Sequence, residues 1–242
     1  MLRLQFKASQ DNVSQAVSQA VVNTQLFKMD KQDRLDLGTG PTFKLKIGDN
    51  IEVCEEVPKR AAMAFSTAFN SQLAAYPKSS AFMLNPAQVT EASVTALVDF
   101  MVGNSKTLKP FSLKTNHLEF PEAINLYRHG LLLGMERYVS GLRVAILDQI
   151  NDHDGPIISY AALNELVQLP IQDGIYQATV RKLEGLMHIK ALDDDQEWPA
   201  WLESHHEFAL QMAAWKAVRK ERVQLARAKR YEQGFPALGD KA

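Results

Sequence analysis

Apolar and polar residues alternate in the stretch from residue 43 to residue 57, and this alternation predicts two β-strands. Between Phe43 and Ile47 every second residue is apolar, and the alternation resumes at Ile51 after the turn residues Gly48-Asp49-Asn50. A period of two places one face of each strand toward a core, and turn residues between two such runs are typical of a β-hairpin. A third short strand is expected over residues 79–84.

In most of the remaining chain the apolar residues recur every three or four positions, which predicts helices. The expected helices span residues 58–69, 90–101, 121–131, 138–150, 160–169, 172–189 and, as one long final helix, 198–232. Gly103 and Gly134 are expected to end two of them. Because a few strands precede an unbroken helical series, we expect an α+β fold. In this fold a small sheet is flanked by a helical cluster, and additional helices and a long C-terminal helix follow.

The same pattern divides the chain into segments. We expect an N-terminal extension with a short strand and helix and a polar connector from residue 28, a domain that contains the sheet, a helical extension, a long helix and a tail. These segments are residues 1–40, 41–150, 151–192, 198–232 and 233–242.

Composition narrows the classes of function. The chain has 242 residues with 27 Lys and Arg against 28 Asp and Glu, and its net charge of -1 gives no overall field to hold nucleic acid or an anionic membrane. Cys54 is the one cysteine, which excludes an internal disulfide and a cysteine-based zinc site and is typical of a reducing compartment. We find neither a secretory signal nor a run of about 20 apolar residues. We therefore expect a cytoplasmic or nuclear protein without membrane contact.

No motif in the sequence indicates catalysis. The glycine-rich phosphate loops and the serine nucleophile elbow are missing. His205-His206-Glu207 is followed by Leu210 where a zincin has its second histidine, and adjacent histidines point to different faces of a helix. Asp152-His153-Asp154-Gly155 continues into Pro156 and lacks the later ligands of a calcium loop. We expect no enzyme, no cofactor, no metal site and no small-molecule substrate.

Two segments are candidates for contact with a partner. Leu2, Leu4 and Phe6 alternate with polar residues and predict a strand that two chains exchange, or a strand that pairs within its own chain. The second half of the final helix is basic, which suits an acidic protein, RNA or DNA, although basic residues there also favour the helix dipole and solubility. These basic residues are Lys216, Arg219, Lys220, Arg222, Arg227, Lys229 and Arg230.

From residue 42 to residue 150 the order of these elements and several of their residues resemble a BTB/POZ domain, in the degenerate form common in filamentous fungi. Six segments match. The first three are the opening strand and turn, the start of the first helix, and a helix with Ser-x-x-Phe spacing. The other three are the strand after that helix, a helix that ends in an aromatic residue, a hydrophobic residue and a glycine, and a helix followed by a leucine, a glycine and a hydrophobic residue. The six segments are Phe43–Asp49, Val57–Lys59, Ser66–Phe69, Phe82–Leu84, Val94–Gly103 and Leu126–Met135. Pro58 stands where the family usually has a histidine.

The resemblance implies a non-enzymatic protein-protein interaction adaptor that forms a homodimer or heterodimer. Family members that dock on cullin scaffolds carry a hydrophobe-x-Glu pattern that Asn70–Leu73 lacks, which disfavours a substrate adaptor of a cullin-type ubiquitin ligase. The alternative from another class is a chromatin- or RNA-associated factor that uses the basic final helix. Solvent exposure of residues 216–230 separates these two hypotheses, and an enzyme with an unrecognised site is a third.

Overall fold

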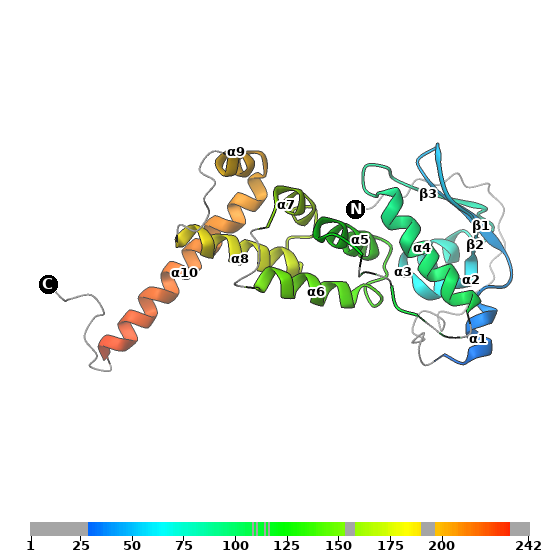
Figure 1. Ribbon diagram of the computed structural model, residues 1–242, viewed down its shortest axis with the longest axis horizontal. Coiled ribbons are helices and arrows are strands. Elements are labelled where there is room, and N and C mark those ends of the chain that lie inside the picture. The colour runs from blue at the N-terminus through cyan, green and yellow to red at the C-terminus, as the bar shows by residue number, and fades with distance from the viewer. Residues whose placement is uncertain are drawn as a thin grey trace. The chain divides into compact units, whose positions relative to one another are not determined.

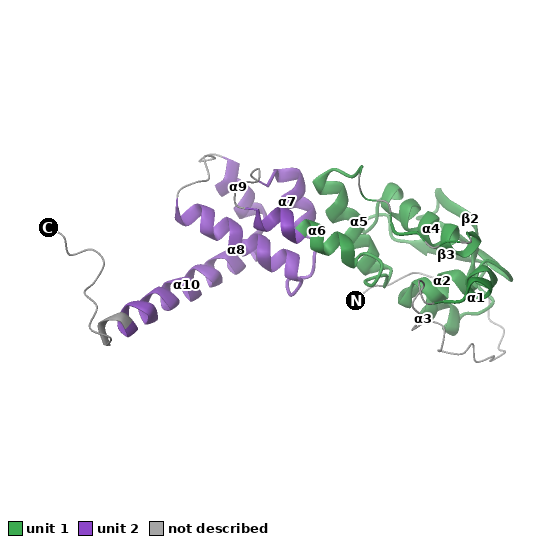
Figure 2. Cartoon of the chain, turned by 60° about the horizontal axis from the view of Figure 1, so that its bottom comes forward, with its two compact units in different colours: residues 1–146 green, residues 147–242 purple. Residues whose placement is uncertain are grey.

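The computed structural model describes residues 29–107, 109, 111–113, 115, 117–152, 158–189 and 197–232. The strand predicted at Leu2–Phe6 and the short helix predicted after it lie outside these residues. The chain divides into two compact units, residues 1–146 and residues 147–242, here called unit 1 and unit 2 (Figure 2).

Unit 1 contains a mixed three-stranded sheet, which lies beside helices α2 (Lys59–Phe65), α3 (Thr67–Ala75) and α4 (Glu91–Lys106) (Figure 1). Its strands are β1 (Thr42–Ile47), β2 (Ile51–Pro58) and β3 (Ala81–Leu84), in the order β2-β1-β3. β1 is antiparallel to β2 and parallel to β3. The predicted hairpin and the predicted third strand are both confirmed, and a parallel β1–β3 pair requires the crossover that the helices between β2 and β3 supply.

Alternation along β1 gives the sheet one buried face. Phe43, Leu45 and Ile47 are buried, whereas the lysines between them lie on the other face. The Phe43 ring packs edge-on against Phe82, with ring centroids 4.6 Å apart, and in a tilted contact against Phe69, with centroids 5.6 Å apart. Aromatic rings in such tilted contacts contribute beyond their buried area. The core of unit 1 therefore forms between this face and the helices.

The helices of unit 1 pack around the sheet and against one another. They are α1 (Lys31–Asp36), α2 (Lys59–Phe65), α3 (Thr67–Ala75), α4 (Glu91–Lys106), α5 (Phe120–Leu132) and the first part of α6 (Ser140–Asn151). Helix α5 begins with a capping box between Glu119 and Glu122, which satisfies free backbone N–H groups at its first turn. It ends before Gly134, as predicted, where φ is +65°.

The regular secondary structure in the described residues of unit 2 is helical, and aromatic rings lie in its core. Its helices are α7 (Tyr160–Leu166), α8 (Gly174–His188), α9 (Glu197–Ser204) and α10 (His206–Glu232). The Phe208 ring of α10 packs edge-on against Tyr176 of α8 at 5.5 Å and against Trp201 of α9 at 5.4 Å. The predicted α+β fold with additional helices and a long C-terminal helix is thus confirmed, and α10 has 27 residues. Within the described ranges, no helix combines the length and apolar character that a membrane crossing requires.

One predicted helix, over residues 58–69, is wrong: the structure has two helices that are separated at Ser66. Ser66 has an extended backbone, with φ of −131° and ψ of 121°. Its buried hydroxyl accepts a hydrogen bond from the Phe69 N–H at 2.9 Å, which caps α3. Serine side chains that bond to nearby backbone compete with a continuous helix, and the apolar spacing alone does not reveal that competition.

The predicted end of a helix at Gly103 and the connector over residues 28–40 also need correction. Helix α4 continues through Gly103 to Lys106, and a Cβ at Gly103 would lie 2.8 Å from the Phe111 ring. The glycine therefore permits close packing and does not end the helix. The connector contains α1, where the Asp30 side chain accepts from the Gln32 N–H and caps the first turn.

The single helix predicted over residues 198–232 is also wrong, because His205 separates α9 from α10. The imidazole of His205 stacks on the Trp201 ring at 4.1 Å, and its Nδ1 lies 2.8 Å from the Trp201 carbonyl oxygen. The Ser204 hydroxyl donates to the same oxygen at 2.8 Å. The His205 N–H also donates to this oxygen, at 3.1 Å, so backbone and side chains share one carbonyl next to the interruption.

Candidate interaction surfaces

Residues that carry the sequence resemblance meet at a buried junction between α3 and the end of α5. The Ser66 hydroxyl donates a hydrogen bond to the Leu133 carbonyl, and the Thr67 N–H donates to the Gly134 carbonyl at 3.0 Å. Gly134 has a positive φ, and a Cβ there would overlap Thr67 Oγ1 and lie 2.9 Å from the Ala68 backbone nitrogen. The serine of one motif and the glycine of the other therefore join two helices and have a structural role.

His129 makes a second buried junction, which our sequence analysis missed. Its Nε2 lies 3.0 Å from the carbonyl oxygen of Gln88, in the turn after β3, and Arg128 donates to the same oxygen at 3.0 Å. Burial and the neighbouring Arg128 charge lower the pKa of His129 to about 4, although the hydrogen bond with Gln88 acts in the opposite direction. The imidazole is therefore neutral near pH 7 and connects α5 to the turn between β3 and α4.

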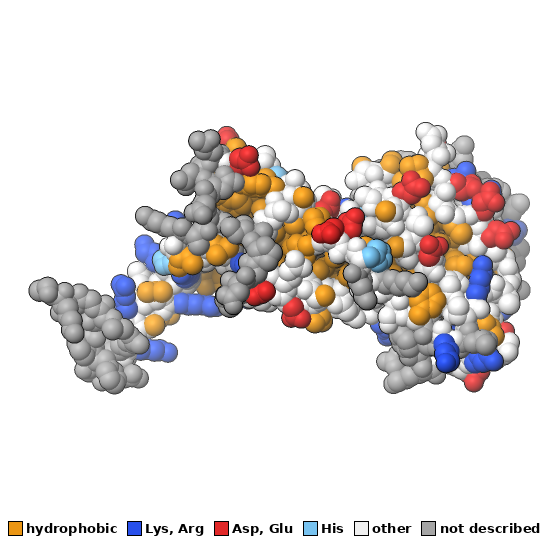
Figure 3. All heavy atoms as spheres, viewed as in Figure 1, with side chains coloured by type: hydrophobic (Ala, Val, Ile, Leu, Met, Phe, Trp, Pro, Cys, Tyr) orange, Lys and Arg blue, Asp and Glu red, His pale blue; other side chains and the backbone are white. Residues whose placement is uncertain are grey.

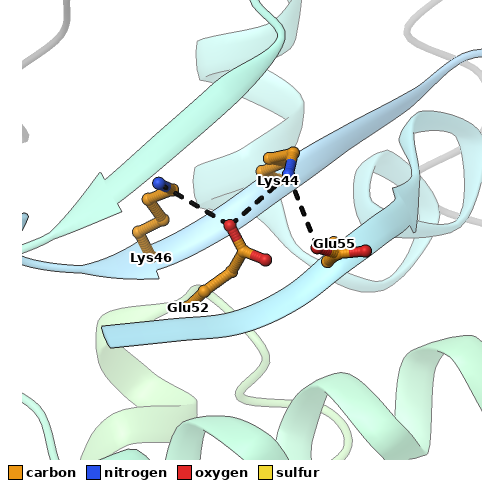
Figure 4. A network of polar contacts seen from close by, with 4 residues as sticks. All are labelled: Lys44, Lys46, Glu52 and Glu55. Carbon is orange, nitrogen blue, oxygen red and sulfur yellow. Dashed lines mark ion pairs between the residues drawn. The ribbon is translucent and has the colours of Figure 1, made fainter. Parts of the chain in front are cut away.

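On the other face of the sheet, two lysines of β1 meet two glutamates of β2 (Figure 4). Lys44 Nζ lies 3.5 Å from Glu52 Oε2 and 3.6 Å from Glu55 Oε1. Lys46 Nζ lies 3.6 Å from Glu52 Oε2. A side-chain hydrogen bond with Glu55 and the charges of both lysines lower the pKa of Glu52. The four charges sum to zero. Exposed ion pairs of this kind contribute little stability, so the cluster gives this face a balanced charge pattern more than rigidity.

The basic residues predicted on the final helix lie on α10 and are mostly exposed. Six of the seven side chains are described, and that of Arg230 lies outside the described residues. Arg219 is half-buried and forms an ion pair with Glu184 of α8 at 3.0 Å. Five side chains are exposed, and no ion pair joins them to any described residue. They are Lys216, Lys220, Arg222, Arg227 and Lys229.

Apolar side chains are exposed on the same half of α10. Val218 is 39% exposed, Val223 45% and Leu225 56%, whereas Phe208 and Met212 in the first half are buried. Figure 3 shows hydrophobic and basic side chains close together in this region. Helical periodicity could have predicted this mixture, but only the structure shows that no described element covers it.

The remaining candidates from the sequence lie in structural positions or outside the described residues. Trp198 and Trp201 are buried, and their rings stack with centroids 5.3 Å apart, so both side chains pack inside unit 2. Among the described side chains, no three of His, Cys, Asp and Glu are grouped so that they could bind one metal ion. His153 and Asp154 of the polar turn lie outside the part that the structure describes.

Comparison with known proteins found no match for this chain. The chain matches no protein-family model, no curated protein and no solved structure in the three comparisons. The contacts and the exposed surfaces described above are therefore the basis for a functional proposal.

Proposed function

We propose that the protein is a non-enzymatic protein-protein interaction adaptor of the BTB/POZ type. In this proposal, unit 1 binds a second copy of the chain or another protein. The segments that resemble the family contribute, in order, to β1, to the start of α2, to α3, to β3, to α4 and to α5. The resemblance of these segments to the family supports the proposal.

One observation carries the proposal: the contact of Ser66 with Leu133 and of Thr67 with Gly134. These residues are separated by 67 positions in the chain, yet they form one hydrogen-bonded junction. A chance resemblance of scattered short motifs gives no reason for their residues to meet. A shared fold gives that reason, because each residue type suits its place in the junction.

The pKa values and the accessibility of two ionisable groups in unit 1 favour a binding function over catalysis. Catalytic acids and bases need a pKa near the working pH and access to substrate. His129 is fully buried with a pKa of about 4, and Glu52 is held by two lysines on the sheet surface. Neither group combines access with a suitable pKa.

The sheet offers a place for association. β2 and β3 are its two edges, and each pairs with one strand among the described residues. Sheet edges bind added strands through their backbone N–H and C=O groups. The alternating segment Leu2–Phe6 is our candidate for such a strand, donated by a second chain.

Light scattering of the full chain tests the proposal. We expect a particle of twice the 27.1 kDa chain mass, or a stable complex with a second protein. A mass of 27.1 kDa at every concentration, with no other protein in the peak, contradicts the adaptor.

The strand exchange has its own matched pair of variants. The first variant combines Leu2→Ser, Leu4→Ser and Phe6→Ser and removes the apolar face of the predicted strand. The second variant combines Arg3→Ser, Gln5→Ser and Lys7→Ser and changes its other face. We expect the first variant to lose the dimer and the second to keep it. A dimer that survives the first variant contradicts strand exchange but leaves the adaptor proposal standing.

The second candidate function is a chromatin- or RNA-associated factor, which the exposure of five basic side chains on α10 favours. Contacts between basic side chains and phosphates weaken steeply with salt. A titration with duplex and single-stranded oligonucleotides at low salt tests it, and absence of binding at micromolar protein dismisses it.

A further inference from the structure

We propose that the second half of α10, residues 216–229, is a docking site for an acidic amphipathic helix of another protein. This surface belongs to unit 2, whereas the adaptor function was assigned to unit 1. The inference therefore stands on contacts of its own.

The spacing of the exposed side chains defines a stripe that suits a helix. Val218, Arg222, Leu225 and Lys229 follow one another at four, three and four positions, so they lie on one side of α10. Apolar and basic side chains alternate along this stripe. The Arg222 guanidinium lies over the Trp215 ring, 5.9 Å from its centroid, which restricts where the charge is presented.

The opposite side of α10 carries a second stripe with the same spacing but a different composition. It consists of Lys216, Lys220, Val223 and Arg227, with one apolar residue among three basic ones. The first stripe has two apolar residues and therefore offers more apolar surface to a partner. We assign the docking site to the first stripe, from Val218 to Lys229.

Charge determines what kind of partner fits. Residues 216–229 contain six basic side chains and one acidic side chain, Glu221. Among the residues that the structure describes, only Arg219 of these six forms an ion pair, with Glu184. A second copy of α10 on this stripe would bring like charges together, which opposes association. An acidic partner compensates the charges.

The apolar side chains separate an acidic protein from a nucleic acid. A phosphate backbone would satisfy Arg222 and Lys229 but would leave Val218 and Leu225 beside charged oxygens. A helix that presents leucines and glutamates at matching positions buries the apolar pair and compensates the basic pair. Helix-in-groove and helix-on-helix recognition use anchors with this spacing.

Fluorescence anisotropy with the full chain and a labelled synthetic peptide tests the site. The probe is a peptide of about 18 residues, in which Leu and Glu alternate along an i, i+4, i+7, i+11 stripe. Its control is a scrambled peptide of the same composition. We expect the designed peptide to bind about tenfold more tightly than the scrambled one, and both to weaken with salt. Equal binding of the two peptides overturns the proposal.

Two pairs of variants then locate the site. Val218→Ser with Leu225→Ser should weaken binding of the designed peptide about tenfold, whereas Leu210→Ser, at another exposed leucine of α10, should not. Arg222→Gln with Lys229→Gln should weaken it more than Lys216→Gln with Lys220→Gln, which removes the same charge from the opposite stripe. Equal effects of the two charge variants, or no effect of the apolar variant, overturn the proposal.

Single-stranded RNA and duplex DNA of matched length complete the test. We expect weaker binding of both than of the designed peptide. Tighter binding of either, unchanged by Val218→Ser with Leu225→Ser, overturns the acidic helix and favours a nucleic acid. The mass of the protein without peptide is measured separately, so failure here is distinguishable from failure of the adaptor function.

Discussion

The two units differ in the distribution of their exposed apolar side chains and in the pairing of their charged side chains. In unit 1 the large exposed apolar residues are scattered over separate elements, as at Ile51, Tyr76 and Val144. In unit 2, α10 exposes Leu210, Val218, Val223 and Leu225, of which Val218 and Leu225 lie on one side of the helix, and Met187 and Ile189 are exposed at the end of α8. Scattered apolar residues are normal on a protein surface, whereas concentrated ones mark contact sites. The charges differ in the same way, because the sheet pairs its lysines with glutamates and α10 leaves most of its basic residues unpaired among the described residues.

Because of this difference, we expect the two regions to respond differently to substitution. Buried junctions of unit 1 join residues far apart in the chain, so their loss should lower the stability of the whole unit. Exposed residues of α10 touch little, so their loss should change binding and leave stability almost unaltered. Substitutions in the two regions therefore test this contrast.

The largest effect is expected for Gly134→Ala. A Cβ at this positive φ is strained and overlaps Thr67, so we expect a loss of about 3 kcal/mol or more in the free energy of unfolding. Urea denaturation measures it. Gly185→Ala in α8, where a Cβ meets nothing within 4 Å, is the control and should stabilise by about 0.5–1 kcal/mol. Equal results for the two variants would show that the α3–α5 junction is not tightly packed.

A pH-dependent effect of similar size is expected at His129. Its pKa is about 4 in the folded protein and about 6.5 in the unfolded chain, so the unfolded chain binds the proton more readily. The stabilising contribution is complete above pH 6.5 and falls as the pH drops from 6.5 to 4, by about 3 kcal/mol in total.

Urea denaturation at pH 7.5 and pH 4.5 measures this loss. His129→Gln should remove most of it, and the same substitution at exposed His117 should leave it unchanged. If the wild type and His129→Gln lose stability equally on acidification, the imidazole is not buried in its neutral form.

Ser66→Ala should have the next largest effect. The substitution removes the cap of α3 and the hydrogen bond to the Leu133 carbonyl, and it leaves that carbonyl without the hydroxyl donor. We expect a loss of about 2 kcal/mol in the free energy of unfolding. Ser71→Ala, at an exposed position of α3, should change it by less than about 0.5 kcal/mol.

The smallest effect on stability is expected for Val218→Ser with Leu225→Ser. Both side chains are exposed, so thermal or urea unfolding should change by no more than about 0.5 kcal/mol. A loss of several kcal/mol would mean that this half of α10 packs within the protein, and would remove the contrast between the two units.

The sequence was sufficient for features that depend on local pattern. Alternation from Phe43 to Ile47 predicts β1, and Gly134 predicts the end of α5. The break at Ser66 was missed because the partner of its hydroxyl, Leu133, lies far along the chain. Helix α1 was missed because it is short and polar and has no apolar stripe.

The candidate binding surface on α10 was also predictable only in part. The basic residues of α10 were identified from the sequence, since charge is visible there. Their exposure depends on which elements pack on α10, and the burial of His129 depends on the turn at Gln88. Neither the exposure of the basic residues on α10 nor the burial of His129 can be predicted from a local sequence pattern.

Native mass spectrometry of the full chain with the designed acidic peptide tests the central claim, that this protein works by binding other proteins, most directly. Closed symmetric dimers present each surface twice. We expect a particle of two chains, each of 27.1 kDa, carrying two peptides. A single chain of 27.1 kDa that carries no peptide at any concentration would contradict it.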